Sequence, residues 1–248
     1  MAVMQRRSML VLLRSLRSAA SRGVRRRASA RQGSDQAPRN VMLGLLGANT
    51  VVLGGWWYAK DQAQHGDPRA YRFMMRHFTS GEPHLLEGRW WTLLTACISH
   101  QDVMHYGVNM LTLSLTAPAL IPLIGAPGVL SLYMGAGLAA SATSILWPYI
   151  VDPILHGDRT SLARRRYRLS QGASGSVYAI ISAFTMMQPR STVYLFFAVP
   201  LPAWLCIGGI AAWELYSASF PRPQSHTDSV GHVGGLLAGV LYARMRGF

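Results

Sequence analysis

Residues 103 to 151 contain no charged side chain, and this run limits the folds open to the chain. About 20 predominantly apolar residues are enough to cross a bilayer as an α-helix, because the hydrocarbon core is about 30 Å thick. The run is more than twice that length and is interrupted by Pro118, by Pro122 and by Gly125-Ala126-Pro127-Gly128. Because proline and glycine favour turns, the run predicts two membrane-spanning helices joined at this segment.

Four other uncharged runs extend this pattern, the last of them short for a span, so that Arg244 and Arg246 should snorkel or the bilayer should thin locally. The runs cover residues 41–59, 169–189, 191–213 and 229–243. Pro200 and Pro202 should kink or partly break the span over 191–213, and the run over 90–99 is too short to cross a bilayer. With 50% hydrophobic and 14% charged residues, the composition also fits a membrane protein. The sequence therefore predicts an all-α polytopic membrane protein with six transmembrane helices in a single domain over residues 41–248.

The net charge of +14 is concentrated at the N-terminus. Residues 1–40 hold ten arginines and a single acid, Asp35. This composition is typical of an organelle transit peptide, and the apolar run before Arg14 is too short for a secretory signal. Nucleic-acid binding by Arg25-Arg26-Arg27 is disfavoured, because no aromatic residues are interleaved with the arginines. We therefore predict a cleaved or disordered targeting leader over 1–40, for a mitochondrion in preference to a plastid or another organelle.

Four polar residues lie at the starts of alternate predicted spans. His105 and Asn109 are one helical turn apart in the second span, Ser174 opens the fourth and His232 opens the sixth. Because the spans alternate in direction, these starts share one side of the membrane. An unpaired imidazole or amide in the bilayer costs several kcal/mol, so we expect the four side chains to converge.

This set of groups predicts nucleophilic catalysis. Ser174 is a weak nucleophile unless a base accepts its proton, and neutral His232 is the natural base. His105, Asn109 and the backbone N–H of Ser174 could stabilise the oxyanion. Asp228 could orient His232, although we favour a solvated charge at that position. For any one of these residues alone, hydrogen-bonded packing is the preferred explanation, and it is their combination that favours catalysis.

Glycines support close contact between the fourth and sixth spans. Gly231, Gly235 and Gly239 recur every four residues and form a smooth stripe that lets another backbone approach. The nucleophile elbow G-x-S-x-G of soluble hydrolases does not fit, because Ser176 occupies its last glycine position. Both cysteines, Cys97 and Cys206, lie in apolar surroundings without metal-ligand spacing, and we interpret them as core residues.

In this order and spacing, the motifs resemble those of the rhomboid intramembrane serine proteases, from about Tyr71 to the C-terminus. Gly172-Ala173-Ser174-Gly175 is similar to the family's G-x-S-G, which implies Ser174 as the nucleophile. His232 with Gly235 and Gly239 matches H-x-x-G-x-x-x-G, which implies His232 as the base of a Ser-His dyad.

Three further positions carry the same resemblance. His100 and the pair His105 and Asn109 match the second-span pattern, in which the latter two line the oxyanion hole. Tyr178 matches an aromatic residue that packs on the catalytic imidazole. One departure is Trp91-Thr92, where the family often has Trp-Arg in its first loop; Arg89 lies two positions before Trp91.

The resemblance also implies a cellular setting. The leader and residues 72–79 are similar to the mitochondrial branch, which often carries an additional span that the sequence does not predict here. It implies a multi-pass protein of the mitochondrial inner membrane, with no metal and no organic cofactor. Its substrates would be single-pass membrane proteins whose helices unwind easily, including a dynamin-like GTPase, cleaved at or within the lipid bilayer.

Two other classes of function remain open at this point. A non-catalytic rhomboid-like protein would bind transmembrane clients, and the presence of both Ser174 and His232 argues against it. A small transporter could use the buried histidine and asparagine groups as a proton or solute path. The absence of charged residues from the predicted spans disfavours a transporter.

Overall fold

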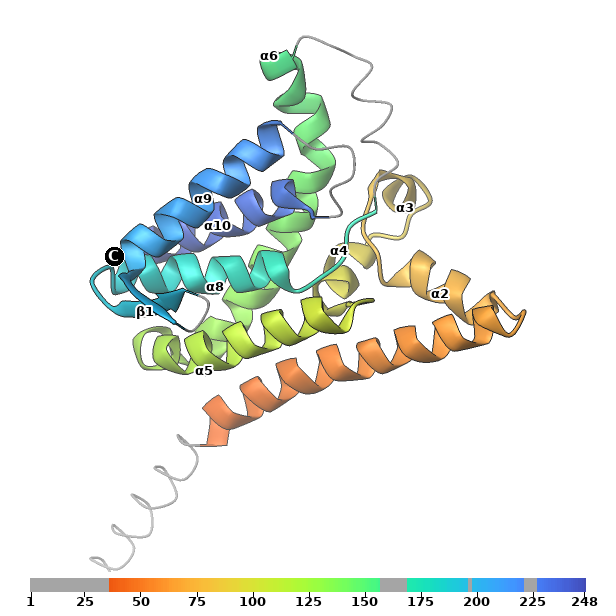
Figure 1. Ribbon diagram of the computed structural model, residues 1–248, viewed down its shortest axis with the longest axis horizontal. Helices are drawn as coiled ribbons and strands as arrows, with labels where there is room; N and C mark the ends of the chain where they lie inside the picture. The colour runs from red at the N-terminus through yellow and green to blue at the C-terminus, as the bar shows by residue number, and fades with distance from the viewer. Residues whose placement is uncertain (1–35, 157–168, 196–197, 221–226) are drawn as a thin grey trace, which may run out of the picture. The chain divides into compact units, whose positions relative to one another are not determined.

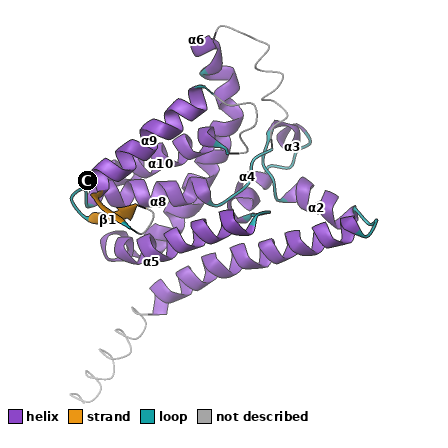
Figure 2. Ribbon diagram, in the orientation of Figure 1, coloured by secondary structure: helices purple, strands orange, loops and turns teal. Residues whose placement is uncertain are grey.

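The computed structural model describes residues 36–156, 169–195, 198–220 and 227–248 (Figure 1). By backbone contacts the chain divides into residues 1–41 and residues 42–248. The predicted leader falls almost wholly outside the described residues. Within the second unit nearly all regular structure is helical, as Figure 2 shows.

A helix over Gln36–Gln64 begins the described chain. The later helices are α2 (Arg69–His77), α3 (Glu82–Leu86), α4 (Thr92–Thr95), the 3-10 turn η1 (Ala96–Ile98), α5 (Val103–Ile150), α6 (Asp152–His156), α8 (Ser174–Met187), α9 (Ala203–Ser219) and α10 (Ser229–Met245). The two strands, β1 (Thr192–Leu195) and β2 (Val199–Pro202), form an antiparallel hairpin.

Two of the described helices are long and apolar enough to cross a membrane by length and composition. They cover Gln36–Gln64 and Val103–Leu155, and Ser174–Met187 is a shorter apolar helix. The second of them is not continuous, because Gly125 takes a φ of 75° and breaks α5 at the predicted turn. The prediction of two helical segments over residues 103–151 is therefore confirmed, whereas the full set of six spans stays a prediction.

The core of the second unit lies where α5, α8 and α10 pack together, with α8 and α10 side by side in Figure 1. A Cβ atom added to Gly235 would lie 2.1 Å from the carbonyl oxygen of Gly175, and one added to Gly239 would lie 2.2 Å from that of Ala179. Such contacts are possible only without side chains. The two backbones thus meet as the glycine repeat predicts.

Within the second unit, the first helix packs on the rest of the chain around a buried tryptophan. Trp56 is fully buried in a cluster with Val52, Ala59 and Met74, and its indole N–H donates to Ser99 Oγ at 2.8 Å. Met74 comes from α2, which carries its arginines on the opposite side of an amphipathic helix. This packing fixes the segment that leads from α2 toward the start of α5.

The predicted span over residues 191–213 is wrong at both ends. Its first part forms the hairpin, and Pro200 and Pro202 lie in β2. Proline has no N–H to donate within a helix, so the helix begins only after Pro202. It then continues past Trp213 to Ser219, so that Glu214, the first residue after the predicted span, is a buried residue of α9.

Candidate active site

Ser174 is the first residue of α8, and the turn before it is held tightly. The helix has no side-chain cap at Ala173, whose N–H donates instead to His100 Nε2 at 3.2 Å. Gly172 takes a φ of 131°, and a Cβ atom there would lie 2.7 Å from His105 Cε1. Only glycine suits this position. A helix that begins without a side-chain cap leaves the N–H groups of its first turn without a partner from the cap residue.

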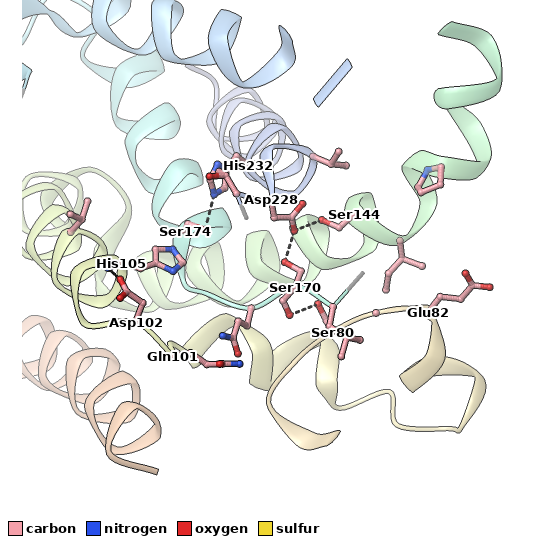
Figure 3. A pocket seen from close by; sticks show the side chains of 18 of the residues that line it. Ser80, Glu82, Gln101, Asp102, His105, Ser144, Ser170, Ser174, Asp228 and His232 are labelled. Atoms are coloured by element: carbon pink, nitrogen blue, oxygen red, sulfur yellow. Dashed lines mark hydrogen bonds between the residues drawn. The ribbon is translucent and has the colours of Figure 1, made fainter. Parts of the chain in front are cut away.

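Ser174 and His232 are joined by a hydrogen bond. His232 Nε2 lies 2.9 Å from Ser174 Oγ, as Figure 3 shows, and His232 is only 7% exposed. The ring of Tyr178, one turn further along α8, stacks on the imidazole with centroids 4.4 Å apart. Gly175 and Gly235 make this geometry possible, because their backbones are in contact directly beside the two side chains.

His100, His105 and Asn109 form a second polar cluster next to Ser174. Asn109 donates through Nδ2 to the His105 carbonyl oxygen at 2.9 Å and to His100 Nε2 at 3.2 Å. The rings of His100 and His105 meet edge to face at 5.1 Å. His100 therefore links Asn109 to the turn before the serine. Both amide hydrogens of Asn109 are already engaged.

A cavity of about 700 Å³ opens onto this site. Ser174, His232 and His105 line it together, and Figure 3 shows them around one space. Asn109 is not among the described residues that line the cavity. The space is large enough for a segment of extended peptide, and both members of the Ser174–His232 pair are accessible from it.

Asp228 is neither a solvated charge nor the group that orients His232. It caps α10 by accepting from the Gly231 N–H at 3.0 Å, and it also accepts from Ser144 Oγ at 2.7 Å and from Ser170 Oγ (Figure 3). A carboxylate at a helix N-terminus satisfies an otherwise unpaired N–H and favours the helix dipole. The expectation of a solvated charge is therefore corrected to a capping role.

Glu214 is the residue near the site that the sequence did not reveal. Its carboxylate Oε1 lies 3.0 Å from His232 Nδ1 and accepts from the Tyr178 hydroxyl at 2.9 Å. A single acid at the end of an apolar run resembled the start of a polar loop. Its position in the run Trp213-Glu214-Leu215-Tyr216, between large apolar side chains, was the available signal of burial.

Neither a metal centre nor a disulfide emerges from the described residues. They contain no group of three or more His, Cys, Asp or Glu side chains that could hold a metal ion. Cys97 and Cys206 are free and buried, in agreement with their interpretation as core residues.

Comparison with known proteins decides the family. The Rhomboid domain model matches residues 87–247, which is well over half of the chain. The chain belongs to the rhomboid family. This rhomboid is 28% identical over 206 residues to "Rhomboid protein 1, mitochondrial" of Saccharomyces cerevisiae, covering 83% of the chain and 53% of that relative.

Two further relatives are also mitochondrial. "RHOMBOID-like protein 12, mitochondrial" of Arabidopsis thaliana is 29% identical over 210 residues, covering 84% of this chain and 59% of the relative. "Presenilin-associated rhomboid-like protein, mitochondrial" of Rattus norvegicus is 23% identical over 207 residues, with 82% and 48% covered. The chain spans about half the length of these relatives. It is a mitochondrial membrane protein of the mitochondrial branch of the family.

The first loop of this rhomboid is anchored without an arginine at position 92. Thr92 is fully buried and donates to the Arg89 carbonyl oxygen at 2.7 Å. The Arg89 guanidinium in turn donates to His84 Nδ1 at 2.9 Å and pairs with Glu87. Burial, followed by the charge of Arg89, lowers the pKa of His84 below its usual value. The guanidinium of this loop thus comes from Arg89, three positions before Thr92.

Proposed function

We propose that this rhomboid is an intramembrane serine endopeptidase with six spans in the mitochondrial inner membrane. The observation that carries the proposal is the 2.9 Å hydrogen bond between Ser174 and His232 inside a chain of this family. Six spans are supported by the division of α5 at Gly125 and by the apolar α8, α9 and α10. The stacked Tyr178 keeps the imidazole in place.

In the proposed reaction, Ser174 Oγ attacks the carbonyl carbon of a peptide bond while its proton passes to His232 Nε2. The resulting tetrahedral oxyanion accepts hydrogen bonds from the Ser174 N–H and from His105. Collapse of the intermediate breaks the C–N bond, and His232 returns the proton to the leaving amine. Water, activated by the same imidazole, then hydrolyses the acyl-enzyme and restores Ser174.

The role proposed for Asn109 as an oxyanion donor is conditional on a change in its hydrogen bonds. In the structure both of its amide hydrogens are used, so donation to the oxyanion requires its bond to His100 to exchange. Until that exchange, Asn109 holds His100 and through it the turn before Ser174. Loss of one oxyanion donor typically lowers kcat by about 10² to 10³.

We propose single-pass transmembrane proteins as the substrates, with a dynamin-like GTPase of the inner membrane as one candidate. A peptide bond within a regular helix is shielded by its backbone hydrogen bonds, so a cleavable segment must first unwind. Glycine, proline or polar residues near the cleaved bond favour that unwinding. The cavity beside Ser174 is large enough to receive an extended segment of this kind.

The test is covalent labelling of the detergent-solubilised protein with a fluorophosphonate probe, combined with cleavage of a single-pass reporter in liposomes. Wild type should be labelled and should cleave, and Ser174→Ala and His232→Ala should lose both, with kcat lower by at least about 10⁴-fold. Ser176→Ala is the matched control, because Ser176 Oγ donates to the Tyr133 carbonyl on the far side of α8. A folded wild type that neither reacts nor cleaves but retains a transmembrane client would establish the client-binding alternative instead.

A further inference from the structure

A buried carboxylate lies directly behind the imidazole of the proposed dyad. Glu214 of α9 is 5% exposed, and its Oε1 atom lies 3.0 Å from His232 Nδ1, the ring nitrogen that faces away from Ser174. In the structure the N–H direction is not aligned well enough for a full hydrogen bond. The distance nevertheless places the two groups in contact, so a small rotation of the ring would complete the bond.

The hydrogen bond to Ser174 determines where the ring must carry its proton. For His232 Nε2 to accept from the Ser174 hydroxyl, the neutral imidazole must hold its hydrogen on Nδ1. A buried N–H needs an acceptor, and Glu214 is the described group at hydrogen-bonding distance. The carboxylate therefore favours the tautomer in which His232 can act as a base.

Tyr178 joins the two partners into one unit. Its ring stacks on the imidazole, and its hydroxyl donates to the same Glu214 oxygen at 2.9 Å. The carboxylate is thus held by α8 as well as by its own helix. A side chain held in this way is pre-organised, so little rearrangement is needed when charge develops on the ring.

The other titratable groups around His232 do not offer the same contact. His105 faces it from α5 across the cavity, and Tyr178 faces it from α8. Asp228 lies one turn earlier on α10, but its oxygens accept from Gly231, Ser144 and Ser170. Among the described residues, Glu214 is thus the carboxylate that contacts the His232 ring.

We propose that Glu214 is a positioning residue that extends the Ser174–His232 pair to a Ser-His-Glu triad. It holds the Nδ1–H tautomer of His232 and stabilises the imidazolium that forms when the serine proton is transferred, while remaining ionised itself. This inference rests on the proposed protease function. It adds a third member that the family resemblance, which implies a dyad, does not supply.

The first test is the pH dependence of kcat/KM for Glu214→Gln, a variant that removes the charge and keeps an oxygen to accept from Tyr178. A carboxylate within about 4 Å favours the protonated ring, so without it the neutral, active ring should persist to lower pH. The acid limb of the profile should move down by about one pH unit or more. At the optimum kcat should fall by about 10²- to 10⁴-fold, with KM nearly unchanged.

Glu87→Gln is the matched control, because Glu87 is an exposed glutamate of the first loop and lies outside the site. It should leave both the acid limb and kcat at their wild-type values. A Glu214→Gln protein with a wild-type profile would overturn the inference. So would one that loses activity only in proportion to its loss of folded protein, with no movement of the acid limb.

A second test does not depend on catalysis. Nitrogen-15 NMR of histidine-labelled protein in micelles above pH 8 distinguishes the two neutral tautomers, with His232→Ala to assign the signal. Wild-type His232 should be in the Nδ1–H form, and Glu214→Leu, which removes the acceptor, should shift it toward the Nε2–H form. An Nε2–H ring in wild type would overturn the inference even if the protein cleaves. A wild type that shows the Nδ1–H ring but no cleavage would overturn the protease proposal alone.

Discussion

Helices α9 and α10 have the same length and carry the two partners of the same contact, yet they are held in different ways. Each has 17 residues. In α10 the buried residues include four glycines, and Gly235 and Gly239 are in backbone contact with α8. In α9 a Cβ atom added to Gly208 or Gly209 would meet nothing within 4 Å.

This contrast shows that the two side chains in contact, His232 and Glu214, are located by different means. His232 must stay within hydrogen-bonding distance of Ser174, and it is carried by the helix whose backbone is fixed against α8. Glu214 is carried by a helix that exposes Trp204, Trp213 and Tyr216. Its carboxylate is located by the polar contacts to His232 and Tyr178 and less by packing of its helix.

The largest expected effect comes from adding a single methyl group to each helix by a Gly→Ala substitution. Gly235→Ala should lower the free energy of unfolding by about 3 kcal/mol or more, because the new Cβ atom would lie 2.1 Å from a backbone oxygen that cannot move away alone. Gly208→Ala meets open space and should be neutral or stabilising by up to about 1 kcal/mol, since alanine favours helices over glycine.

Both free energies can be measured by SDS titration in mixed micelles, with fluorophosphonate labelling as the readout of the site. A loss of stability confined to Gly235→Ala would support the comparison. If Gly235→Ala proved as stable as wild type, the close approach of α8 and α10 would not exist in the detergent-solubilised protein.

The same contrast explains what the sequence could predict. The glycine repeat of α10 and the break at Gly125 are encoded by local residue types, because no other residue tolerates such contacts or such a φ angle. The positions of Ser174 and His232 followed from alternating spans, which place helix starts at a common depth. Local rules of this kind were sufficient for the backbone frame of the site.

Where tertiary contacts override local pattern, the sequence was misleading. Glu214 appeared to begin a loop because an acid ended an uncharged run, whereas its burial depends on His232 and Tyr178, which come from other helices. Asp228 appeared solvated because its polar neighbours Ser144 and Ser170 are distant in sequence. Neither pairing is visible without the fold.

A smaller effect should follow from removing the cap of α10. Asp228 accepts a hydrogen bond from the Gly231 N–H, whereas α9 begins after Pro202 without a side-chain cap. Asp228→Ala should therefore lower the free energy of unfolding by about 2 kcal/mol, through the lost cap and the lost bonds from two serines. Asp61→Ala removes an exposed acid within a helix and should change it by less than about 0.5 kcal/mol. Equal effects of the two substitutions in the same SDS titration would count against the capping role.

The smallest difference between the helices should come from one hydroxyl on each. Tyr242 of α10 donates to the Gly128 carbonyl oxygen of α5 at 3.3 Å and accepts from Arg246 in an exposed contact. Tyr216 of α9 is 54% exposed, and its hydroxyl has no partner among the described residues. Tyr242→Phe should lower the free energy of unfolding by about 0.5 to 1 kcal/mol, the usual net value of one hydrogen bond. Tyr216→Phe should leave it unchanged within error. Because both substitutions keep the aromatic ring, a loss of stability confined to Tyr242→Phe isolates the polar contact, and equal values would place the advantage of α10 in its glycine packing alone.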